Sequence, residues 1–160
     1  MKRSVALGQN RLQRGFSMVE VMVSVVVLSV GLLGMAALQA RSLQENRGAY
    51  LRSQGSILAY DILERIRANS DAAIAGKYDM SMGTRKFSTG NSMADTDLKD
   101  WVANLTSLLP SGDGSVDCDS NGNCTVIVQW FDNSVTEDVN EDGVVDDKDK
   151  VTSITLASTL

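Results

Sequence analysis

The sequence predicts an α+β protein in which one long N-terminal helix packs on a small antiparallel sheet. Three observations indicate this class: an uncharged apolar run near the N-terminus, helical spacing of apolar residues beyond that run, and two β-branched segments near the C-terminus. A chain of 160 residues has room for an anchor and one modest domain. We expect three regions, namely a leader (1–15), a membrane helix (16–40) and a folded body (41–160).

The apolar run predicts a membrane span. No charged residue occurs between Val21 and Ala40, and a helix of that length covers roughly 30 Å, the thickness of the hydrocarbon core. The run is too long for the core of an ordinary secretory signal peptide. Residues 1–15 carry a charge of +4, so the rest of this chain of net charge −5 carries −9. By the positive-inside rule, the N-terminus is expected in the cytoplasm and the body outside it.

Glu20 is a carboxylate placed among apolar residues, between Val19 and Val21. A charge inside a membrane helix costs about 2.5–3.5 kcal/mol on insertion scales, so it requires a partner. Neither a secretory signal peptide nor a plain single-span anchor explains its position. The partner must be Arg14, the membrane interface or a group on another chain.

The segment Arg14-Gly15-Phe16-Ser17-Met18-Val19-Glu20 resembles the signal of type IV prepilins and pseudopilins. This resemblance implies that a prepilin peptidase cuts after Gly15 and that the new terminal residue, Phe16, is N-methylated. It also implies that Glu20 pairs with the terminal ammonium of a neighbouring subunit, so that both charges leave water together on assembly. The expected fold is then pilin-like.

Beyond the apolar run, helical spacing continues to about Ala68, where Asn69-Ser70-Asp71 is a plausible stop. The apolar stripe of this second half consists of Leu51, Leu58, Ala59, Ile62, Leu63 and Ile66. Another helix could cover this stripe, but we expect the chain's own sheet to do so. Gly48 and Gly55 weaken the helix without forbidding it.

The body is predicted to contain one short helix and two strands. The helix spans Asp97 to Leu109, with Asp95, Thr96 or Asp97 as its cap and Trp101 on its packed face. Residues 76–95 are expected to be a loop or weak strands. The strands are Thr125–Phe131 and Val151–Leu156, which suit a small antiparallel sheet.

Two cysteines, Cys118 and Cys124, flank a segment dense in turn-forming residues. In an extracytoplasmic body such a pair predicts a disulfide. Closing so small a loop stabilises the fold by roughly 2–2.5 kcal/mol in the chain-entropy model.

Several body segments are similar to those of the type IV pilus modification proteins of the PilV kind, a family of minor pilins. They are the Ser56–Asn69 segment, the Leu98–Pro110 helix, the Gly112-Asp-Gly114 turn and the Cys124–Trp130 strand. The resemblance implies a subunit that joins other minor and major pilins in priming pilus assembly, sits at the tip and meets a tip adhesin. The alternative within the superfamily is a minor pseudopilin of a type II secretion or competence system.

Residues 137–150 hold seven acids and two lysines, which most often means a solvated loop. The spacing, however, matches a calcium loop, with oxygen donors at positions 1, 3, 5, 9 and 12 and glycine at position 6. It also resembles dockerin-type calcium modules. The predicted Ca²⁺ ligands are Asp138, Asn140, Asp142, Val144 through its carbonyl, Asp146 and Asp149.

The composition argues against two other classes of function. The chain has no histidine, which removes the commonest general base, and no nucleophile is paired with a base or catalytic metal. We therefore expect no enzymatic activity and no catalytic residue. The acidic body, which has no basic cluster, argues against nucleic-acid binding by this chain alone.

Overall fold

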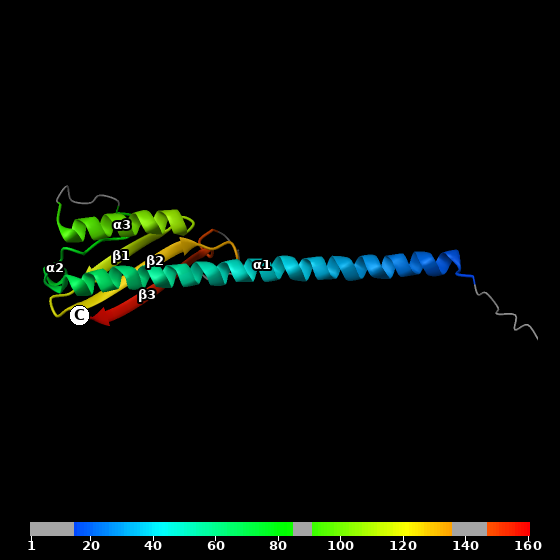
Figure 1. The fold of residues 1–160 in the computed structure, drawn as a ribbon, viewed down its shortest axis with the longest axis horizontal. Coiled ribbons are helices and arrows are strands. Elements are labelled where there is room, and N and C mark those ends of the chain that lie inside the picture. Colours follow the sequence, from blue (N-terminus) through cyan, green and yellow to red (C-terminus); the bar gives the residue numbers. More distant parts are fainter. Residues whose placement is uncertain (1–14, 85–90, 136–146) are drawn as a thin grey trace, which may run out of the picture. The chain divides into compact units, whose positions relative to one another are not determined.

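The computed structural model describes residues 15–84, 91–135 and 147–160. Three helices come first, α1 (Met18–Ala68), α2 (Ser70–Ile74) and α3 (Met93–Leu108). Three strands follow, β1 (Asp113–Cys118), β2 (Asn123–Phe131) and β3 (Val151–Thr159). The chain divides into two compact units, Met1–Arg41 and Ser42–Leu160. The predicted pilin-like α+β class is confirmed, with a long N-terminal helix and a three-stranded antiparallel sheet (Figure 1).

The first half of α1 is exposed on every side. Its most apolar stretch is long and apolar enough to cross a membrane by length and composition, and the described residues bury none of that stretch. The hydroxyls of Ser24 and Ser29 donate to the carbonyls of Glu20 and Val25, each at 2.7 Å. Because these hydroxyls are satisfied within the helix, they add little cost in apolar surroundings.

The second half of α1 buries one face. The stripe predicted from the spacing is buried, and the sheet of the same unit covers it, as expected (Figure 1). The buried members are Leu51, Leu58, Ala59, Ile62, Leu63 and Ile66. α1 ends at Ala68, as the Asn69-Ser70-Asp71 signal predicted, although the chain continues into the short helix α2.

The sheet has the order β1-β2-β3, with both pairs antiparallel. The central strand β2 alternates between buried and partly exposed residues, and Val126, Val128 and Trp130 point into the core. Both predicted strands exist. β2 begins two residues earlier than expected, and β3 runs three residues further, because each is held over its length by its neighbour.

Strand β1 was not predicted, and the Gly112-Asp-Gly114 turn proposed for this segment is wrong. Gly114 lies within β1, paired with Val128. Asp, Gly and Ser have low strand propensity, so the sequence gives no local sign of a strand here. The reason is tertiary: a Cβ on Gly114 would lie 2.5 Å from Cη2 of Trp101, so only glycine lets the strand pass beneath that ring.

Helix α3 begins at Met93, four residues before the predicted start. Its cap is Ser92, whose hydroxyl accepts a hydrogen bond from the Asp95 amide at 3.1 Å. In return, the Asp95 carboxylate accepts a hydrogen bond from the Ser92 amide. This reciprocal capping box replaces the predicted caps Asp95, Thr96 and Asp97. The predicted packing role of Trp101 is confirmed, because its indole is fully buried and donates to the Leu58 carbonyl at 2.8 Å.

The segment between α2 and α3 makes one contact with the sheet. Met80 and Val116 form an isolated antiparallel bridge, with N–O distances of 2.8 and 2.9 Å. This bridge lies on the side of β1 that does not pair with β2. The segment 76–95 was expected to be a loop or weak strands. Its described residues before Met93 show a loop with a single β-bridge, and the last three residues, 93–95, belong instead to α3.

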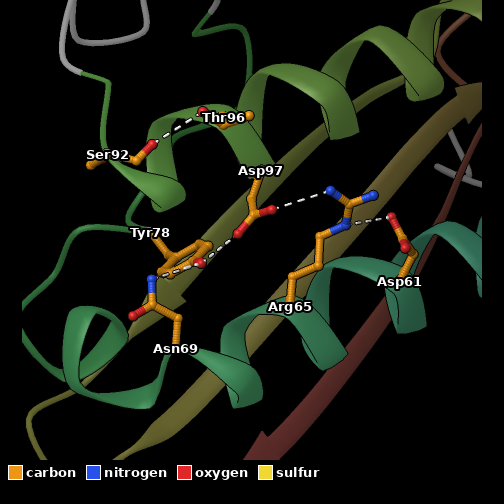
Figure 2. Close-up of polar contacts among 7 residues, drawn as sticks. All are labelled: Asp61, Arg65, Asn69, Tyr78, Ser92, Thr96 and Asp97. Atoms are coloured by element: carbon orange, nitrogen blue, oxygen red, sulfur yellow. Dashed lines mark hydrogen bonds and ion pairs between the residues drawn. The ribbon is translucent and has the colours of Figure 1, made fainter.

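A polar network joins the end of α1 to α3 (Figure 2). Arg65 donates to Asp61 at 3.1 Å and to Asp97 at 3.2 Å. The other oxygen of Asp97 accepts from the buried Tyr78 hydroxyl at 2.7 Å, and Asn69 donates to that hydroxyl at 3.2 Å. Two causes raise the pKa of Tyr78 to about 12: mainly the burial of its hydroxyl, and to a smaller extent its hydrogen bond to Asp97. The network thus ties the chain segment after α2 to both helices.

The packing of α1 on the sheet predicts that Gly55→Ala destabilises the body. A Cβ there would lie 2.6 Å from Cζ3 of the buried Trp130 ring. We expect a loss of about 1–3 kcal/mol, as for overpacked cores. Denaturant unfolding of the full chain in detergent, followed by tryptophan fluorescence, measures it. Gly31→Ala is the matched control, because a Cβ at Gly31 meets nothing within 4 Å. Equal effects of both variants would contradict this account.

The polar network predicts a pH-dependent contribution from Tyr78. Folding raises the pKa of its phenol from 10.0 to about 12, so the stabilisation is complete below pH 10 and is lost as pH rises through about 12. Tyr78→Phe should lower the unfolding free energy by about 1.5–3 kcal/mol, the range for hydrogen bonds to charged groups. That difference from wild type should shrink between pH 10 and pH 12. The exposed Tyr60→Phe serves as control, and a pH-independent difference for Tyr78→Phe would refute the assignment.

Candidate functional site

The residues before α1 form an exposed, irregular segment. Gly15, Phe16 and Ser17 have no helical or strand structure, and Phe16 is 82% exposed. Ser17 starts the helix, since its hydroxyl accepts from the Val19 amide at 3.4 Å and its carbonyl from the Val21 amide at 3.2 Å. The Gly15–Phe16 bond therefore lies outside regular structure, directly before the helix, where a protease could bind the backbone in extended form.

Glu20 lies in the first turn of α1 and is exposed. Its carboxylate is near the positive end of the helix dipole, which favours a negative charge. Among residues 15–84, 91–135 and 147–160, nothing forms an ion pair or hydrogen bond with its side chain. Arg14, one of its predicted partners, lies outside the described residues. A partner on another chain is compatible with this geometry.

The first half of α1 offers apolar side chains around its whole circumference. A helix that is apolar on all sides is covered by lipid or by other helices. The large side chains exposed here are Met18, Val19, Val21, Met22, Val23, Val25, Val26, Val27, Leu28, Val30, Leu32, Leu33, Met35 and Leu38. This half can therefore occupy a bilayer or the core of a helical assembly.

The predicted disulfide is present between Cys118 and Cys124, with an S–S distance of 2.07 Å. It joins the end of β1 to the start of β2, where the two cysteines are paired in register. The hairpin is reinforced by Asp119, whose Oδ1 accepts from the amides of Asn121 and Asn123 at 2.9 and 2.8 Å. Hydrogen bonds from Asn123, with a smaller part from Asn121, lower the pKa of the Asp119 carboxyl.

Most of the predicted calcium loop lies outside the described residues, namely Asp138, Asn140, Asp142, Val144 and Asp146. Asp149 is described and is buried, only 3% exposed, in the turn before β3. The Asp132 amide donates to the Lys150 carbonyl at 2.7 Å, so the acidic segment is closed at its base between β2 and β3. Within the described part of the chain, no three acidic or cysteine side chains come together as a metal site.

Sequence reasoning missed a small cavity beside the end of β2. It has a volume of about 150 Å³, and its wall includes Leu51, Pro110, Phe131 and Asp132. Asp132 is 1% exposed, although aspartate is among the residues most rarely buried. No motif marks this residue, because α1 and the turn after β2 together bury it.

Comparison with known proteins adds one finding about the N-terminus. Residues 10–36 match the family model described as "Prokaryotic N-terminal methylation motif". The match contains Gly15, Phe16, Glu20 and the first part of α1. No curated protein and no solved structure matches the chain.

The methylation motif indicates a structural protein family rather than an enzyme family, and it fits membrane anchoring and incorporation into a pilus. It also suggests processing by a prepilin peptidase and partnership with other pilins. The fold agrees, since a long apolar helix continues into a body in which it packs on a small antiparallel sheet. The chain carries the N-terminal signal of type IV pilin-like prepilins, and this supports its place in the pilin superfamily as a type IV pilin or pseudopilin.

Proposed function

We propose that this protein is a minor pilin that takes part in priming type IV pilus assembly and is located at the pilus tip. The observation that carries the proposal is helix α1, which follows Gly15–Phe16 in the sequence. Its first half is apolar on all sides, and the methylation motif matches its beginning. The alternative is a minor pseudopilin of a type II secretion or competence system, which would use the same helix. Neighbouring genes for a tip adhesin favour the first, and genes for a secretin-linked exoprotein system the second.

The assembly chemistry centres on Phe16 and Glu20. Cleavage after Gly15 leaves Phe16 with a terminal ammonium, which is then N-methylated and keeps its positive charge. Glu20 follows four residues later, in the first turn of the helix. A neighbouring subunit's terminal ammonium would neutralise this carboxylate, which offsets the cost of holding each charge in apolar surroundings.

The topology follows from charge and from the disulfide. The leader, with a charge of +4, stays in the cytoplasm, and the acidic body is exported. The Cys118–Cys124 bond forms in the oxidising periplasm. The protein first resides in the inner membrane as a single-pass precursor, and then leaves it with the extracellular pilus.

The minor-pilin role rests on the resemblance of body segments to PilV-type proteins. Three of these segments supply residues to the core of the body: Ser56–Asn69 at the end of α1, Leu98–Pro110 in and just after α3, and Cys124–Trp130 within β2. Its partners would be other minor and major pilins, the prepilin peptidase and a tip adhesin. Nucleic-acid binding by this chain alone is not part of the proposal, because residues 16–160 carry a charge of −9.

We also propose that the acidic segment binds Ca²⁺ through Asp138, Asn140, Asp142, the Val144 carbonyl, Asp146 and Asp149. The spacing of oxygen donors in the sequence supports this, together with Gly143 at the sixth position. Bound calcium would then link several side chains of the segment that connects β2 and β3.

The assembly role predicts that Glu20→Ala abolishes function without preventing processing. In a deletion strain, the variant should enter the membrane and lose its leader, yet piliation and twitching should fall at least tenfold because a subunit ammonium is left unpaired. Surface pili are counted, and leader loss is followed by the mass of the chain. Gln39→Ala, which changes an uncharged residue of the same half of α1, is the control. Full complementation by Glu20→Ala would remove the assembly role.

The calcium proposal predicts saturable heat in isothermal titration of the full chain in detergent. The expected dissociation constant is about 10⁻⁴–10⁻³ M, the range of extracellular modules. Asp138→Ala/Asp142→Ala should lose the heat, since two of the side-chain ligands are gone. Asp117→Ala, which removes an exposed carboxylate on β1, should keep it. Identical heats for wild type and the double variant would end the idea.

A further inference from the structure

The cavity beside Asp132 combines apolar walls with a buried acid. Leu51 of α1, Pro110 and Phe131 supply the apolar part. The polar part consists of Gln44, Arg47, Asp132, Asn133 and Ser134. All of these residues belong to the Ser42–Leu160 unit. Its volume of about 150 Å³ is close to that of an engineered cavity that admits benzene, so a guanidinium group or a short alkylammonium would fit.

The Asp132 carboxylate is only half satisfied. Its Oδ1 accepts from the Ser134 amide at 2.9 Å and from the Ser134 hydroxyl at 2.6 Å. Its Oδ2 is buried and has no hydrogen-bond partner among the described residues. A buried carboxylate oxygen without a hydrogen bond lowers the stability of the fold, and a cation or a strong hydrogen-bond donor beside it would remove that cost.

Among the described residues, the basic side chains near Asp132 form no bond to its Oδ2. Arg47 lines the same cavity, yet it is exposed and forms no ion pair with Asp132. Lys150 is bound to Asp147 at 3.3 Å, and its ammonium lies 6.0 Å from the centre of the Phe131 ring. Gly48 brings the α1 backbone close to Asp132, since a Cβ there would be 3.3 Å from Oδ2. A backbone in the middle of a helix has no free donor to offer.

We propose that this cavity receives a lysine or arginine side chain from a neighbouring pilin subunit, with its charge beside the Asp132 carboxylate and its methylene stem against Leu51, Pro110 and Phe131. Basic side chains bury their stems on apolar surface while their heads bind carboxylates. The body's net charge favours a basic partner surface. The identity of the partner as a pilin rests on the proposed function.

A basic side chain fits this cavity better than a divalent metal ion does. Calcium takes six to eight oxygen ligands, most of them from several side chains. The described residues contain no group of three acidic or cysteine side chains that could hold a metal. The apolar wall would also remain without a role around a metal, whereas it suits the stem of a lysine or arginine.

The first test is binding of n-butylammonium, a lysine side-chain mimic, to the full chain in detergent. The amide NMR signals of Ser134 and Gly48 report on the site, and n-butanol and CaCl₂ are titrated in parallel. We expect saturable shifts with n-butylammonium, at least tenfold weaker affinity in Asp132→Asn, and no change in Asp117→Asn. Asparagine retains an acceptor for the Ser134 amide, so the fold should persist, and unchanged signals from the Cys118–Cys124 hairpin verify it. No saturation, an equal response to n-butanol, or saturation by CaCl₂ alone would overturn the proposal.

The second test identifies the occupant in assembling cells. A photoreactive amino acid at Asn133, in the cavity wall, should cross-link to a lysine- or arginine-containing peptide of another pilin subunit. The yield should fall at least tenfold with Asp132→Asn and stay unchanged with Asp117→Asn. Cross-links to non-pilin proteins, or a yield insensitive to Asp132→Asn, would overturn the partner assignment. Failure of the proposed function would look different, since Glu20→Ala would then leave piliation intact while n-butylammonium still bound.

Discussion

The second half of α1 carries an apolar stripe that cannot be left in water, and the rest of the body is arranged around covering it. The sheet lies on this stripe, and Trp101 of α3 donates to the Leu58 carbonyl of the helix. The approach is close enough that Gly55 faces the Trp130 ring without room for a methyl group. Gly48 and Gly55 would weaken an isolated helix, yet they allow α1 to pack closely on the rest of the body. Tertiary packing here outweighs helix propensity.

The two halves of α1 differ in what covers their apolar side chains, although they form one continuous helix. The first half is apolar all round, a pattern typical of helices that are covered by lipid or by other helices. The second half is covered by its own sheet, and the Cys118–Cys124 bond and the Tyr78 network hold the body together around it. The body therefore has a folded core of its own, which does not depend on what covers the first half of α1.

Some of the candidate sites could be read from the sequence, and others could not. Glu20 stood out because a carboxylate among valines is costly, and the cysteine pair stood out because it flanks a turn. Asp149 is the one predicted calcium ligand within the described residues, and it is buried. Asp132 gave no signal, since its burial depends on Gly48 of α1, which lies 84 positions earlier in the chain.

The sequence by itself determined the membrane-length helix, the methylation motif, the buried stripe and the two β-branched strands. These features depend on hydropathy, charge and spacing within one segment, which the order of residues states directly. Only the tertiary structure decided that Asp113–Cys118 is a strand, that α3 starts at Met93, and that Asp132 lies beside a cavity. Each of these depends on contacts between residues far apart in the chain, such as Gly114 beneath Trp101, where packing overrides local propensity.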